Sequence, residues 1–161
     1  MNIYSLQQLE IKGVESLSSL EEQLNRAIGE LQLLDQLIND VRARITTLQA
    51  IAAEHEGALN FVEELIKTES GMKVLLPIGG GNYVHAEIVD KDKIEVSVGA
   101  GIVITKTPAE GREIIEKRRE NLLQAIQNFE QRLQQYLNRA EELKSIIEVL
   151  SEKIREAGVR K

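Results

Sequence analysis

The hydrophobic residues of this chain fall mainly into two long stretches with the same spacing. In the first stretch, apolar residues recur at alternating steps of three and four from Leu17 to Ile66, and His55 is the one polar residue in the series. A mean spacing of 3.5 residues keeps one face of a helix against a partner helix throughout. The pattern predicts a coiled-coil helix over residues 1–66. Gly13 falls on a seam position, so the register of the first dozen residues is weaker.

A second seam of this kind runs from Ile115 to Ala157 and is interrupted by Arg119. Before it, Thr107, Pro108 and Glu110 supply a capping hydroxyl, a proline at the first helical position and the acid of a capping box. These cues predict a helix over residues 108–161. Two helices of similar length, each with one seam, can cover each other if the chain turns back. An antiparallel pair is therefore favoured over a parallel coiled coil between chains.

The segment between the helices, residues 67–107, is too long for a helix–helix connection, which usually takes about 2–8 residues. Apolar and polar residues alternate in Val84–Ile88, Ile94–Val98 and Ile102–Ile104, and glycine-rich turns stand at Gly79–Asn82 and Gly99–Gly101. A period of two is typical of strands. The expected fold is therefore α+β: a long antiparallel two-helix coiled coil with two β-hairpins inserted between the helices.

Isolated hairpins are marginal in water because each has unpaired edges and one apolar face. Pro77 cannot donate a hydrogen bond to a neighbouring strand, which favours an edge position for the first strand. We therefore expect the insert to be an oligomerisation platform that pairs with hairpins of other subunits. The apolar residues expected to carry oligomerisation are Leu75, Ile78, Val84, Ile88, Val96, Val98, Ile102 and Ile104.

Composition agrees with an extended helical protein and excludes several functions. Aromatic residues make up 3% of the chain and tryptophan is absent, which is little material for a compact globular core. The net charge of −6 argues against a nucleic-acid partner. The sequence has neither a signal peptide pattern nor a run of about 18 apolar residues, so we expect no membrane association and a cytoplasmic location. The absence of cysteine agrees with a reducing compartment.

Candidate chemistry is sparse. Gly79–Gly81 is followed by a strand pattern rather than a helix, so a hairpin turn is favoured over a phosphate-binding loop. His55 and His85 are the only histidines and lack nearby partners that would complete a metal site. Paired acids such as Glu63 and Glu64 lie on a predicted solvated helix face. We therefore expect no catalytic residues, no metal and no cofactor, and hence a protein that is not an enzyme.

The two-helix organisation and the insert together resemble the prefoldin family, and specifically its alpha class, which has two β-hairpins between its helices. The resembling segments are Leu76–Gly81, Val84–Ile88 and Val98–Val103. The resemblance implies an ATP-independent holdase whose hairpins join subunits and whose coiled coils bind unfolded client proteins. It also implies beta-class subunits as partners in a hetero-hexamer, and delivery of clients to a group II chaperonin.

An antiparallel pair rooted at the insert would bring both chain ends together at the far tip, where apolar residues could touch a client. The residues expected to bind clients are Ile3, Tyr4, Leu6, Leu9, Ile11, Leu150, Ile154 and Val159. The alternative function is a structural filament or scaffold protein that self-assembles through the same hairpins, as the resemblance to gamma prefoldins implies.

Overall fold

The computed structural model describes the backbone of residues 3–69 and 71–159 and the side chains of residues 17–69 and 71–157. Helix α1 spans Ile3–Lys67 and helix α2 spans Pro108–Val159. Between them lie the strands β1 (Met72–Gly79), β2 (Asn82–Ile88), β3 (Ile94–Gly99) and β4 (Ile102–Lys106). The predicted fold class, two long helices with two hairpins between them, is confirmed. Helix α1 continues through Gly13 without a break.

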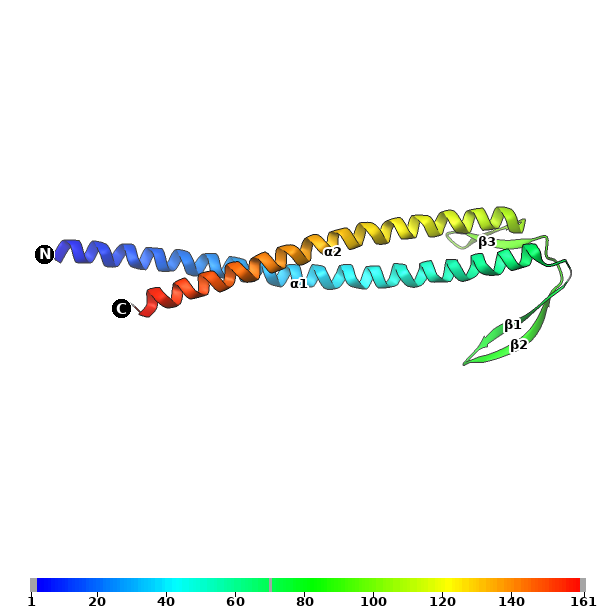
Figure 1. Ribbon diagram of the computed structural model, residues 1–161, viewed down its shortest axis with the longest axis horizontal. Coiled ribbons are helices and arrows are strands. Elements are labelled where there is room, and N and C mark those ends of the chain that lie inside the picture. Colours follow the sequence, from blue (N-terminus) through cyan, green and yellow to red (C-terminus); the bar gives the residue numbers. More distant parts are fainter. Residues whose placement is uncertain (1–2, 70, 160–161) are drawn as a thin grey trace. The chain divides into compact units, whose positions relative to one another are not determined.

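The chain divides into two compact units, each containing parts of both helices. The first unit comprises residues 1–45 and 128–161, and the second comprises residues 46–127 with both hairpins. In the first unit, α1 begins and α2 ends at the same end (Figure 1). The two helices are therefore antiparallel there, as the two seams predicted.

The core of the first unit is the predicted seam. Its buried residues are Ala27, Leu34, Ile38, Ala140 and Leu143. The seam residues Leu31, Leu133, Tyr136 and Ile147 pack against them, together with Leu37 and Leu137 from outside the seam. A bidentate ion pair joins the two helices beside this core. Arg139 donates from Nε to Glu30 Oε1 at 2.8 Å and from Nη2 to Glu30 Oε2 at 3.1 Å. The guanidinium holds the pKa of the Glu30 carboxyl below its ordinary value.

In the second unit, ion pairs also join the two helices. Arg112 donates from Nε to Glu63 Oε1 at 3.0 Å. Arg119, which interrupts the predicted seam of α2, pairs with Glu56 of α1. His55, the polar residue of the other seam, bonds through Nδ1 to the carbonyl of Ile51 at 2.9 Å. The two polar seam residues are thus partnered rather than left unsatisfied, as partly buried polar groups require.

The predicted seam is wrong at one residue. Ile66 was expected to face α2, but its side chain is 48% exposed, whereas that of Leu65 is 2% exposed. A straight α-helix has 3.6 residues per turn, so a seam with a period of 3.5 drifts around the helix and eventually shifts to the neighbouring residue. In α1 this shift falls in the last turn.

The start of α2 is a complete capping box. The Glu110 carboxylate accepts from the backbone nitrogen and the hydroxyl of Thr107, both at 3.1 Å, and the Glu110 nitrogen donates to Thr107 Oγ1 at 3.3 Å. These hydrogen bonds, with Lys106 Nζ nearby, hold the pKa of Glu110 below its ordinary value. The predicted helix start is therefore confirmed.

The two hairpins have the same turn geometry. Gly79 pairs with Asn82 across Gly80 and Gly81, and Gly99 pairs with Ile102 across Ala100 and Gly101. All four central residues have positive φ, as the two-residue turn that matches the twist of a hairpin requires. Gly79–Gly81 therefore forms a hairpin turn, as predicted. Ala100, at φ 50°, is the one described residue other than glycine with a positive φ.

Candidate functional site: the apolar faces of the hairpins

The β1–β2 hairpin has one entirely apolar face. The register pairs Met72 with Ile88, Val74 with Ala86, and Leu76 with Val84, and side chains that pair across strands lie on the same face. The face is half-buried near the helices and becomes exposed toward the turn, where Leu76 is 53% exposed. Ile78, which lies at the bulge beside the turn, is 65% exposed. This hairpin therefore presents uncovered apolar surface at its tip.

The β3–β4 hairpin also has a mainly apolar face, with Lys106 opposite Ile94, and part of this face is covered by its own chain. Val96 pairs with Ile104. Near the helices, Val96 is only 4% exposed, and Ile94 is half-buried beside Gly111 of α2. Toward the turn, Val98 and Ile102 are exposed. The apolar face of this hairpin is therefore divided into a base that packs inside the chain and a tip that does not.

Most residues predicted to carry oligomerisation are at the surface. Leu75, Ile78, Val84, Val98 and Ile102 are exposed. Ile88 and Ile104 are half-buried.

Val96 departs from this prediction. It is buried against α2, so its side chain is not available to another subunit as the chain stands. The cause is the close approach of β3 to Gly111, which the alternating pattern of the strand does not reveal.

Three further apolar residues of the hairpins are exposed but were not among those predicted to carry oligomerisation: Leu76, Tyr83 and Val103. Leu76 follows Leu75 directly, and only the register shows that Leu76 shares a face with Val84 while Leu75 shares one with His85. Both outer edges of each two-stranded sheet are also unpaired within the described chain. Such edges and faces are suited to pairing with strands of another chain.

The residues predicted to bind clients lie mostly outside the described side chains, namely Ile3, Tyr4, Leu6, Leu9, Ile11 and Val159. Of the other two, Leu150 is buried and Ile154 is half-buried. Leu150 therefore contributes to helix packing and has little surface left for a client. Ile146 and Val149, which lie three residues apart on α2, are exposed apolar residues that the seam pattern passed over.

The ion pair between Arg139 and Glu30 sets the register of the two helix ends. Beyond this ion pair, α2 continues for twenty residues to Val159, whereas α1 extends for twenty-seven residues to Ile3. Helix α1 therefore has seven more residues on this side of the ion pair than α2, namely Ile3–Leu9. They include four of the predicted client-binding residues.

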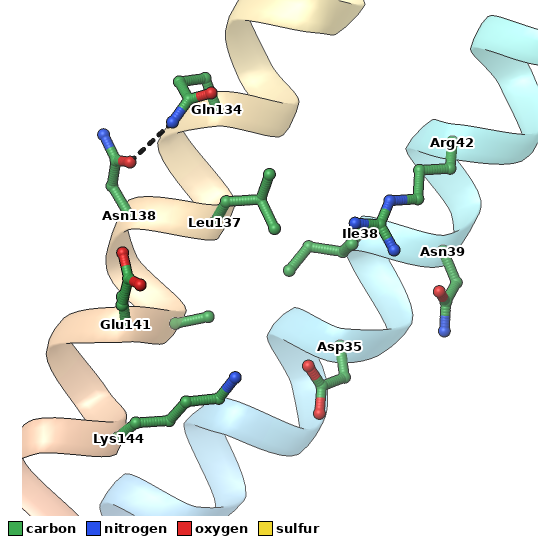
Figure 2. Close-up of a pocket in the computed structure, with 10 residues that line it drawn as sticks. Asp35, Ile38, Asn39, Arg42, Gln134, Leu137, Asn138, Glu141 and Lys144 are labelled. Atoms are coloured by element: carbon green, nitrogen blue, oxygen red, sulfur yellow. Dashed lines mark hydrogen bonds between the residues drawn. The ribbon is translucent and has the colours of Figure 1, made fainter.

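The first unit also has a groove along one side of its helix pair. Its volume is about 600 Å³, and its floor is formed by Ile38, Leu137 and Ala140. Figure 2 shows Leu137 pointing toward Ile38, and Gln134 donating to Asn138 at 2.8 Å on the rim. The remaining lining residues, Asp35, Asn39, Arg42, Glu141 and Lys144, carry two charges of each sign. This open, mixed-charge groove gives no basis for assigning a small-molecule site.

The described residues also bear on metal binding and membrane insertion. No group of three or more His, Asp or Glu side chains there is arranged to hold a metal ion. None of the helices in that part of the chain is long and apolar enough to cross a membrane.

Comparisons with known proteins identify this arrangement. The family profile described as "Prefoldin subunit" matches residues 34–153. A prefoldin subunit alpha of Methanococcoides burtonii is 30% identical over 127 residues, which cover 79% of this chain and 92% of the relative. Prefoldin subunit 5 of Arabidopsis thaliana is 33% identical over 124 residues, covering 77% of this chain and 74% of the relative.

A solved structure agrees with these relatives. The chain is similar to filamentous PFD of Methanocaldococcus jannaschii, determined by cryo-electron microscopy, with a TM-score of 0.61 and 26% identity. The similarity covers 73% of this chain and 97% of the solved one. With its helix–hairpin–hairpin–helix fold and its matched residues, the chain belongs to the prefoldin family of chaperone subunits.

Proposed function

We propose that this chain is a subunit of an ATP-independent holdase that binds unfolded proteins at the ends of its helices and passes them to a group II chaperonin. Its partners would be beta-class prefoldin subunits in a hetero-hexamer, or further copies of itself, in the cytoplasm. Family membership supports a chaperone role. The observation that carries the finer proposal is the uncovered apolar surface at the hairpin tips, where Leu76, Ile78, Val98 and Ile102 are exposed.

The hairpin tips support assembly on energetic grounds. Each fully buried Leu, Ile or Val side chain contributes about 1.5–3 kcal/mol relative to leaving it in water. Leu76, Ile78, Val98 and Ile102 are all exposed in the single chain. Burying them against another subunit would add several kcal/mol, whereas a two-stranded sheet alone is marginal. Assembly through the hairpins would leave the start of α1 and the end of α2 free.

The helix ends support client binding through their sequence and their register. Ile3, Tyr4, Leu6 and Leu9 fall within the seven residues by which α1 is longer than α2, counted outward from the Arg139–Glu30 ion pair. Apolar side chains without a packed partner can adsorb exposed hydrophobic segments of an unfolded protein. Several such ends in one assembly would bind together more tightly than any one alone. No nucleotide or covalent chemistry is needed for such binding.

The filament alternative has its own support. The solved relative named above is described as filamentous, and it is covered by this chain over 97% of its length. Electron microscopy of the purified chain alone separates the two assemblies. Long fibres formed without a second subunit favour the filament, and small oligomers that require a beta-class subunit favour the hetero-hexamer.

Client binding can be tested by diluting a chemically unfolded protein into buffer with the assembled chaperone and no nucleotide. We expect aggregation, followed by light scattering, to be suppressed. Replacing Tyr4, Leu6 and Leu9 together with serine should raise the amount of chaperone needed by about tenfold. Each helix end then has less apolar surface to contact the client, and the loss of affinity is compounded over the several helix ends that bind one client.

Leu33→Ser is the matched control, since Leu33 is an exposed leucine of α1 far from the helix end. Suppression that the triple substitution leaves unchanged would show that clients bind elsewhere. If the unsubstituted assembly does not suppress aggregation, the holdase proposal itself is wrong.

A further inference from the structure

The β3–β4 hairpin approaches α2 closely at Gly111, in the first turn of that helix. Figure 1 shows β3 running beside the start of α2. A Cβ atom added to Gly111 would overlap Ile94 Cδ1, and it would lie 2.9 Å from Ile94 Cγ1 and 3.2 Å from Val96 Cγ2. Real Cβ atoms essentially never approach other heavy atoms below 3.0 Å. Only glycine therefore allows the strand to pack this close without a shift of Ile94.

Gly111 differs from the other glycines in the helical segments with described side chains. Gly29 and Gly57 of α1 have no atom within 4 Å of an added Cβ, so no close contact requires glycine at either position. A glycine inside a helix is less favourable than alanine. At Gly111 that loss is offset by strand packing, since Val96 is buried and Gly111 is itself buried.

The glycine at the base of the β1–β2 hairpin makes a different contact. This residue, Gly71, faces the flexible carboxylate of Glu87 in its own sheet. The linker between the hairpins is tied instead to the end of α1, where Lys91 Nζ donates to the Thr68 carbonyl at 2.8 Å. Among the glycines with described surroundings, Gly111 is therefore the one at which a strand packs against a helix.

We propose that Gly111 is a positioning residue for subunit assembly: it anchors β3–β4 on α2 and so fixes the direction in which Val98 and Ile102 are presented to a partner subunit. The inference rests on the assembly role proposed above. A tip held in one orientation loses less freedom on binding than a mobile one, so anchoring strengthens association without adding any contact to the partner.

The anchor can be measured in the isolated chain, before any partner or client is added. The sequence has no cysteine, so Ser97→Cys and Glu113→Cys provide the only two attachment sites for spin labels, one on β3 and one on α2. We expect a narrow distance distribution between the labels in the otherwise unchanged chain and a broadened or shifted one with Gly111→Leu. An unchanged distribution with Gly111→Leu would overturn the proposal.

Assembly is the second readout. Gly111→Ala should weaken association with a beta-class subunit or with further copies by about tenfold, because overpacking displaces the anchored strand. Gly57→Ala is the matched control, a helical glycine with open space, and should raise the melting temperature while leaving association unchanged.

Ile94→Ala removes both side-chain atoms that an added Cβ would meet below 3.0 Å. In that background, Gly111→Ala should no longer weaken association, and the distance distribution should again be narrow. Failure of this rescue would overturn the positioning role.

The outcome also distinguishes this inference from the proposed function. If Gly111→Leu displaces the hairpin but association stays unchanged, while substitutions at Leu76 and Val84 weaken assembly, the positioning role is wrong and the assembly role stands. If neither set of substitutions alters assembly, the assembly role of the hairpins is wrong.

Discussion

Replacing Leu76 and Val84 together with threonine should weaken subunit association by about 100-fold. The two side chains pair across β1 and β2 and lie exposed on the same apolar face. If each contributes about 1.5 kcal/mol when buried against a partner, losing both costs about 3 kcal/mol, or two factors of ten in the dissociation constant. Sedimentation velocity over a concentration series gives this constant directly.

Threonine is chosen because it favours strands, so the hairpin itself should persist. The matched control is the pair Leu33→Thr and Val149→Thr, which removes the same kinds of exposed side chain from the helices. The control should associate as the unsubstituted chain does. Equal weakening by both pairs would indicate a general loss of solubility or stability, and weakening by neither would mean that subunits join elsewhere.

Leu143→Ala should lower the free energy of unfolding by about 3 kcal/mol, within the range of about 2–5 kcal/mol seen for large-to-small changes in protein cores. The Leu143 side chain is 2% exposed and belongs to the core between the two helices of the first unit. Helix pairing in that unit depends on this narrow seam, so a cavity there cannot be filled by other layers. Urea unfolding followed by circular dichroism measures the change.

The control for this change is Leu123→Ala, a leucine of the same helix that is 43% exposed. Most surface changes of this kind alter stability by no more than about 0.5 kcal/mol. The free energy of unfolding should therefore be lower for Leu143→Ala than for Leu123→Ala by about 2 kcal/mol or more. Similar losses at both positions would contradict the seam as the source of helix pairing.

The fold was predictable because its signals are local and repeated. A seam of spacing 3.5 specifies which face of each helix is buried, and the capping residues Thr107 and Glu110 mark the helix start by side chain to backbone bonds within one turn. Glycine residues likewise mark both turns in the sequence, and in the structure they have the positive φ that these turns require. Ile66 was missed because small deviations from the ideal period accumulate along a helix of 65 residues.

The candidate site was less predictable because it depends on contacts between distant parts of the chain. Alternation identifies the apolar face of β3, but it cannot reveal that Val96 is covered by α2, since Gly111 lies fifteen residues later. Register decides that Leu76 rather than Leu75 shares a face with Val84. Ile146 and Val149 were missed because they fall between seam positions, where the pattern predicts polar residues.

The central claim is that the hairpins join subunits and the helix ends bind clients. It is tested most directly by site-specific photo-crosslinking to a client. A photoreactive amino acid replaces Leu6 in one preparation of the assembled protein and Leu76 in another, and each is irradiated with a chemically unfolded protein. The account predicts client adducts from position 6, and adducts to neighbouring subunits from position 76. Client adducts that form mainly from position 76 would contradict it.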